Sequence, residues 1–209
     1  MWRQLAILIV CSVVVLIAVW ISTTPAPERL PDPSRAVRTP ETCVAPVRLP
    51  ANGDEWGSWF FTRAKEPRLD CGPMHADEAY RFTWAHAFAG RHPITALIMR
   101  TDAMVTVITS EYRFEPPSLL QKLSQSKRQI STAEWTRVRT MLANIEFWQM
   151  ERDEVVTGFD GSTWTIEGRV GRSYHRVSRW TPWDSPFRRV ALELLRLGGL
   201  GDPEPRSGL

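Results

Sequence analysis

The feature that constrains this chain most is an uncharged apolar run near its start. Residues 5–21 are almost entirely Leu, Ile, Val and Ala, interrupted by one Cys, one Ser and one Trp. Such a run either spans a membrane as a helix or forms the core of a secretory signal. Trp2 and Trp20 bracket it over roughly 27 Å of helix, and indole rings favour the two membrane–water interfaces. We therefore predict a transmembrane anchor over residues 1–21, inserted through residues 4–21, with a cleaved signal peptide as the alternative.

The charges beside this run leave its orientation open. Arg3 precedes it, while Arg29, Arg35 and Arg38 follow it. The positive-inside rule alone would therefore keep the rest of the chain in the cytoplasm. Long domains, however, translocate with little regard to flanking charge.

The cysteines favour export. Outside the apolar run the chain has two, Cys43 and Cys71, and an even pair in an exported domain suggests a disulfide. Two unrelated thiols are the alternative. We expect a Cys43–Cys71 disulfide and a domain on the oxidising side of the membrane.

Composition divides the remaining chain. Residues 22–50 hold seven of the sixteen prolines, which is typical of a semi-stiff extended linker. We expect a globular domain over residues 51–200 and a disordered tail over residues 201–209. Residues 51–209 carry 21 basic and 20 acidic residues, so the domain is close to neutral and we expect no nucleic-acid partner.

The elements of the domain are predicted from periodicity and end signals. Tyr80 and Trp84 at helical spacing predict a helix over residues 75–90. A second helix should begin after Ser131, where Glu134 completes a capping box. A third should begin after Ser185. Residues rich in β-branched and aromatic types predict two hairpins, with strands over residues 94–100, 104–110, 163–169 and 173–180. We predict an α+β domain: an antiparallel sheet built from hairpins, with helices on one face, following one N-terminal transmembrane helix.

Several chemistries are not indicated. The chain contains no Walker loop, no G-x-G-x-x-G after a strand, no G-x-S-x-G and no H-E-x-x-H, so we expect no cofactor. The spacings of its four histidines match no common structural zinc site. We therefore expect no metal.

The turn at Gly171-Arg172 sets the register of the second hairpin. A two-residue turn places Glu167 opposite Arg176, as a structural ion pair beside Tyr174. A three-residue loop would instead place Glu167 opposite His175, forming a carboxylate–imidazole pair able to transfer protons. Turn preference favours the first register. Glu167, His175 and the nearby Asp160 are weak catalytic candidates.

Arginine and tryptophan alternate after this turn. Arg176, Arg179, Trp180 and Trp183 are the residues we expect to contact a partner, since arginine beside aromatic surface suits proteins, anionic lipids and acidic glycans. Alternate residues of a strand point to opposite faces, so these arginines cannot form a single patch.

The same segment carries a family resemblance. D-G-x-x-W-x-x-E-G from Asp160, then Y-H-x-V-x-R-W-x-P from Tyr174, with Y-R-F-x-W from Tyr80 upstream, resembles an uncharacterised group of bacterial exported or membrane-anchored proteins. The match covers residues 78–200. It implies a bacterial envelope setting and a single compact domain, and no catalytic residue.

These observations lead to one functional hypothesis and one alternative. We expect a single-pass protein of the bacterial inner membrane whose periplasmic domain is an interaction or scaffolding module. Its partner would be an envelope protein, an anionic lipid or a glycan. The alternative is a small envelope hydrolase that uses Glu167 and His175.

Overall fold

The computed structural model describes residues 60–71, 73–86, 92–102, 104–115, 119–153 and 161–205. The predicted anchor, the linker, Cys43 and Asp160 lie outside the described residues. Within the described part of the chain, no helix is both long enough and apolar enough to cross a membrane.

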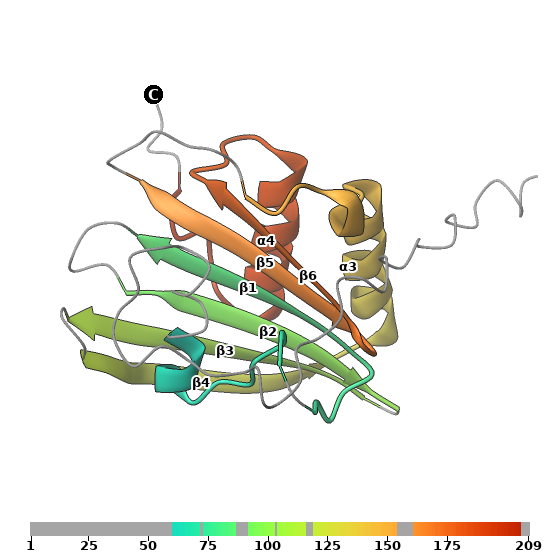
Figure 1. Ribbon diagram of the computed structural model, residues 1–209, viewed down its shortest axis with the longest axis horizontal. Coiled ribbons are helices and arrows are strands. Elements are labelled where there is room, and N and C mark those ends of the chain that lie inside the picture. The colour runs from blue at the N-terminus through green and yellow to red at the C-terminus, as the bar shows by residue number, and fades with distance from the viewer. Residues whose placement is uncertain are drawn as a thin grey trace, which may run out of the picture.

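A six-stranded antiparallel sheet forms the centre of the domain (Figure 1). The first four strands, β1 (Glu78–His86), β2 (Ile94–Thr101), β3 (Met104–Glu115) and β4 (Leu119–Ile130), follow one another as neighbours. The second hairpin, β5 (Ser162–Val170) and β6 (Ser173–Trp180), adds to β1 on the other side. The strand order is therefore β4-β3-β2-β1-β5-β6. The α+β class and the antiparallel sheet are confirmed.

Two helices begin where their sequence signals place them. In α3 (Thr132–Asn144), the Ser131 hydroxyl accepts from the Glu134 amide and the Glu134 carboxylate accepts from the Ser131 amide. In α4 (Pro186–Leu197), the Ser185 hydroxyl accepts from the Arg188 amide. The short helix η3 (Phe147–Gln149) follows α3 in the chain, and in Figure 1 α4 lies behind the sheet with α3 beside it at the right. The local capping chemistry was sufficient to predict them.

The helix predicted over residues 75–90 is wrong, because strand β1 occupies this part of the sequence. Tyr80 and Trp84 are four residues apart, which places them on one face of a helix but equally on one face of a strand. The residues between them distinguish a strand from a helix. Phe82 is buried with Tyr80 and Trp84, and Arg81 lies on the opposite face of the sheet. Alternation with period two was the stronger signal.

Strand β4 was not predicted. Its described side chains from residue 121 to residue 129 are all exposed, so no buried face imposes an alternating pattern on its sequence. Its pairing with β3 shifts register between Glu111 and Tyr112, a bulge of the kind found at sheet edges. The edge position of β4 explains why hydrophobic periodicity missed it.

The two faces of the sheet differ in chemistry. The face toward the helices is apolar and aromatic, and it packs Tyr80, Phe82 and Trp164 against α3, η3 and α4. The opposite face carries many charged and hydroxyl side chains. Residues 60–71, which we call the strap, contact this polar face from the front in Figure 1.

Candidate functional site

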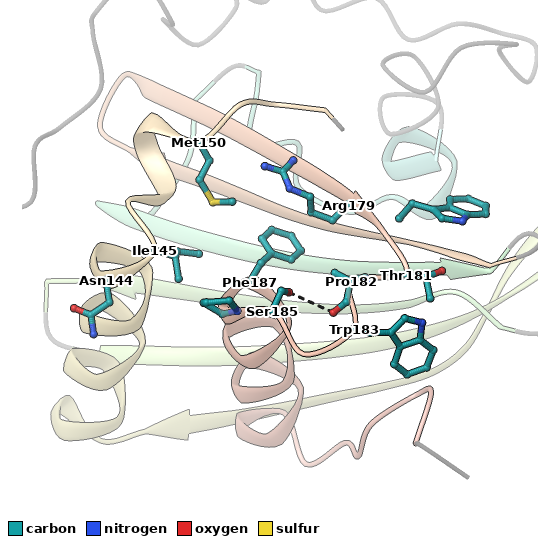
Figure 2. A pocket seen from close by; sticks show the side chains of 11 residues that line it. Asn144, Ile145, Met150, Arg179, Thr181, Pro182, Trp183, Ser185 and Phe187 are labelled. Atoms are coloured by element: carbon teal, nitrogen blue, oxygen red, sulfur yellow. Dashed lines mark hydrogen bonds between the residues drawn. The ribbon is translucent and has the colours of Figure 1, made fainter. Parts of the chain in front are cut away.

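An open cleft of about 470 Å³ lies where β6 ends and α4 begins (Figure 2). Figure 2 shows that its residues come from the end of α3, the segment after η3, the last residues of β6 and the first turn of α4. The lining is mainly apolar and aromatic: Asn144, Ile145, Met150, Arg179, Trp180, Thr181, Pro182, Trp183, Ser185, Pro186 and Phe187. Three of the four residues predicted to bind a partner therefore line one cleft.

The loop between β6 and α4 adopts an uncommon backbone conformation. Thr181 and Asp184 have φ angles of 41° and 52°, in the left-handed region that L-residues seldom occupy. The surrounding contacts hold this geometry: the Thr181 amide donates to the Ser162 carbonyl at 2.9 Å, and its hydroxyl accepts from the Ser162 amide at 3.2 Å. Positive-φ residues of this kind cluster at binding sites.

Trp183 is half-exposed at the rim of the cleft, with 49% of its surface accessible. The Arg188 guanidinium lies 4.8 Å from its ring centroid and 4.3 Å from that of Trp164. Asp202 fixes the guanidinium, accepting from its Nη2 at 2.7 Å. Trp183 is therefore supported by a buried cation while much of its surface faces solvent.

The contacts of Arg188 also involve residues near the C-terminus. Residues 201–209 were expected to be a disordered tail, but residues 201–205 pack against α4. Asp202 and the Glu204 carbonyl both accept from Arg188. A buried guanidinium needs acceptors, and the end of the chain supplies them.

The predicted arginines divide between the two sheet faces, as strand alternation requires. Arg179 lines the cleft, where its guanidinium donates to the carbonyls of Ser178 at 2.7 Å and Glu151 at 3.0 Å. Arg176 lies on the polar face and pairs with Asp153 at 3.1 Å. Burial alone would lower the pKa of Arg176, but Asp153 together with Tyr174 and Glu167 outweighs burial, so the pKa is raised. Arg176 therefore does not belong to the cleft.

Glu167 and His175 are not brought together. Glu167 is opposite Arg176 in the hairpin, which confirms the two-residue turn and its register. His175 is opposite Gly168 and faces the helices, where its Nε2 lies 3.0 Å from the Met150 carbonyl oxygen. The described residues therefore do not form the carboxylate–imidazole pair that the hydrolase alternative requires.

The partner of Glu167 is Arg81, which sequence reasoning did not identify. Arg81 is fully buried, and its Nη2 lies 2.6 Å from the Glu167 Oε2 atom. Tyr174 donates to the other oxygen of Glu167 at 2.8 Å. Burial raises the pKa of Tyr174, as does the Glu167 charge. Arg81 and Glu167 are 86 residues apart, so the signal in the sequence was a charged residue between two aromatic ones, Tyr80 and Phe82.

A second buried carboxylate, Glu66, lies in the strap and was also missed. Its Oε1 atom accepts from Ser110 at 3.0 Å, from Lys122 at 3.1 Å and from the Tyr112 hydroxyl. Burial alone would raise the pKa of Glu66, but the hydrogen bonds from Tyr112 and Lys122 outweigh it, so its pKa is lowered. Burial and the contact with Glu66 raise the pKa of Tyr112.

The described residues contain no group of three or more His, Cys, Asp or Glu side chains placed to hold a metal ion. Cys71 is buried at the end of the strap. Its predicted pairing with Cys43 stays a prediction, because Cys43 lies outside the described residues.

Comparisons with known proteins add no family assignment. No protein-family model matches the chain, and no curated protein matches it significantly.

Proposed function

We propose that this chain is a membrane-anchored interaction module of the bacterial envelope. In this proposal residues 1–21 hold it in the inner membrane, residues 22–50 act as a spacer, and the sheet domain lies in the periplasm. The observation that supports a binding role is the cleft, which collects Arg179, Trp180 and Trp183 at one end of the sheet. These are residue types that dominate binding energy at protein interfaces.

A protein is the partner class that the lining favours. Besides the two tryptophans, the cleft presents Met150, Phe187 and two prolines, with Arg179 as its only charged residue. Protein interfaces are enriched in aromatic residues, Met and Arg at their centres and depleted in other charges. An anionic lipid or an acidic glycan would call for several cations in the lining.

Photo-crosslinking from the cleft tests this proposal in native membranes. A photoreactive phenylalanine at position 183 should give one discrete adduct, which mass spectrometry would identify. The same residue at position 104 is the control, because Met104 is 50% exposed and therefore as accessible as Trp183. Equal adducts from both positions, or background from both, would contradict the proposal.

The partner found in this way should then be tested as a purified protein. We expect Trp183→Ala to weaken binding to the full-length chain at least tenfold, since a tryptophan that a partner buries commonly contributes about 2 kcal/mol or more. Met104→Ala should leave the affinity unchanged. A lipid or glycan partner would show the Trp183 effect with vesicles or soluble glycan and none with the protein.

The topology part of the proposal has its own test. The full chain should resist alkaline extraction from membranes, and its domain should be degraded by protease added to spheroplasts. A non-reducing gel of the native protein should show a mobility change on reduction if Cys43 and Cys71 are paired. Protection from external protease would place the domain in the cytoplasm and overturn this part.

A further inference from the structure

The strap crosses the polar sheet face in the manner of a bound peptide. Phe61 stacks on the Arg81 guanidinium at 3.3 Å, and the Pro67 carbonyl accepts from Arg81 Nη1 at 2.6 Å. Further along, the carbonyls of Leu69 and Cys71 accept from Arg169, each at 3.4 Å. Two arginines of the sheet thus stack on one aromatic ring of the strap and donate to three of its backbone carbonyls. Peptide recognition commonly uses this combination of backbone contacts and side-chain positions.

The strap also inserts one carboxylate into a site built by the sheet. Ser110, Tyr112 and Lys122, from the neighbouring strands β3 and β4, all donate to one oxygen of Glu66. Ser110 is itself oriented by Gln125, whose amide donates to its hydroxyl oxygen at 3.0 Å. These donors belong to the sheet and not to the strap, so the sheet retains them when the strap leaves.

The polar face also contains a buried hydroxyl group to which the strap makes no hydrogen bond. The hydroxyl of Thr83 is buried and makes no hydrogen bond among the described residues. Thr83 on β1 is opposite Thr95 on β2, and Thr95 is in turn opposite Ser110. The Thr95 hydroxyl lies near the carboxylate site, where its interaction with the Tyr112 hydroxyl lowers the pKa of Tyr112. A buried hydroxyl without a partner is costly, and a ligand with polar groups here would remove that cost.

We propose that the polar sheet face is a peptide-binding site whose resident ligand is the strap, with Ser110, Tyr112 and Lys122 as its carboxylate receptor. The exchanging ligand is an acidic segment of a partner protein. Without the strap, the face presents Arg81, Arg169 and Lys122 against Glu167, so its charge complements an acidic segment. This site is separate from the cleft around Trp183 and does not depend on it.

Chemical rescue tests the carboxylate receptor in the full-length chain. Glu66→Ala should lower the melting temperature, and acetate, which matches the carboxymethyl group that this substitution removes, should restore it. At ten times its dissociation constant, acetate should raise the ratio of folded to unfolded protein about elevenfold. The control is Glu193→Ala, since Glu193 is also buried but pairs with exposed arginines of the helices. No rescue, or equal rescue of both variants, would overturn the receptor.

Exchange of the strap is tested with a peptide in trans. A fluorescent peptide of residues 60–70 should bind a full-length Phe61→Ala/Glu66→Ala variant at least tenfold more tightly than the wild type, whose own strap competes. The same peptide with Glu66→Gln should bind the variant more weakly. Equal binding to variant and wild type, or equal binding of both peptides, would overturn the proposal. Concentration-dependent dimers of the wild type that exchange straps would assign the site to a second copy instead.

The unused hydroxyl of Thr83 provides a third readout, independent of the strap. Thr83→Val should leave the melting temperature unchanged or raise it, because the lost hydroxyl makes no hydrogen bond in the strap-bound state. Thr165→Val, in the same cross-strand row, is the matched control. Its hydroxyl lies 3.0 Å from that of Ser178, so this variant should be less stable. A larger loss from Thr83→Val would show that the hydroxyl serves the fold and not a ligand.

Discussion

Glu167→Ala should be among the most damaging substitutions in the domain. It removes the carboxylate that faces Arg81, whose side chain is fully buried and whose Nη2 lies 2.6 Å from Glu167. It also removes the acceptor of the Tyr174 hydroxyl. Leaving a buried charge without its partner costs about 3–5 kcal/mol. For a domain of roughly 150 residues, each kcal/mol lowers the melting temperature by about 2–4 °C.

Urea unfolding of the full-length chain in detergent measures this loss. The control is Arg128→Ala, which breaks the ion pair with Glu134; the two side chains are 45% and 32% exposed, so this variant should cost about 1 kcal/mol or less. The double variant Arg81→Met/Glu167→Leu should recover much of the loss, because apolar residues of similar volume replace a buried pair at little cost. A Glu167→Ala loss no larger than that of Arg128→Ala would refute the reasoning.

Three further predictions concern stability. The lowered pKa of Glu66 means that its contribution is present above the unfolded value, near 4.5, and is lost as pH falls through the folded pKa; the melting temperature of the wild type should fall more steeply below pH 4.5 than that of Glu66→Gln. Gly168→Ala should destabilise by about 1–3 kcal/mol, because the added Cβ would lie 2.7 Å from Phe147 and 2.9 Å from Tyr80; denaturant titration measures it. Ser131→Ala should cost about 1 kcal/mol by the same assay, since it removes the capping box of α3.

Features fixed by neighbouring residues could be predicted from the sequence. The starts of α3 and α4 follow from side chains that cap amides three residues away, and the register of β5 and β6 follows from a two-residue turn. Trp180 and Trp183 line one cleft because they lie close together in the chain. Local chemistry decides each of these features, so one sequence is enough to indicate them.

The polar face could not be predicted in the same way. Arg81 and Glu167 are 86 residues apart, and Glu66 and Tyr112 are 46 apart. No periodicity or motif links such pairs, because the sheet topology brings them together. Strand β1 was also misread as a helix, which removed the alternation that would have placed Arg81 opposite Phe82. Because β1 was predicted as a helix, Arg81 could not be assigned to the polar face of the sheet from the sequence.

The two faces of the sheet should also differ in how readily their covers detach. Helix α4 buries six apolar side chains against the aromatic side of the sheet: Phe187, Val190, Ala191, Leu194, Leu195 and Leu197. Exposing a large apolar side chain costs roughly 1.5–3 kcal/mol. The strap buries three large apolar side chains, Phe60, Phe61 and Leu69. Its other contacts are hydrogen bonds and ion pairs, which water replaces at a net cost of about 0.5–1.5 kcal/mol each. Local opening should therefore release the strap while α4 stays packed.

Hydrogen exchange of the full-length chain separates these two events. Amides of residues 60–71 should exchange faster than those of α4, with an opening free energy below that of global unfolding. Phe61→Ala should accelerate exchange in the strap, because it removes the ring that stacks on Arg81, and should leave α4 unchanged. Exchange of strap and helix at one common rate would mean that the strap opens only when the domain unfolds. The polar face would then be inaccessible to any partner in the folded state.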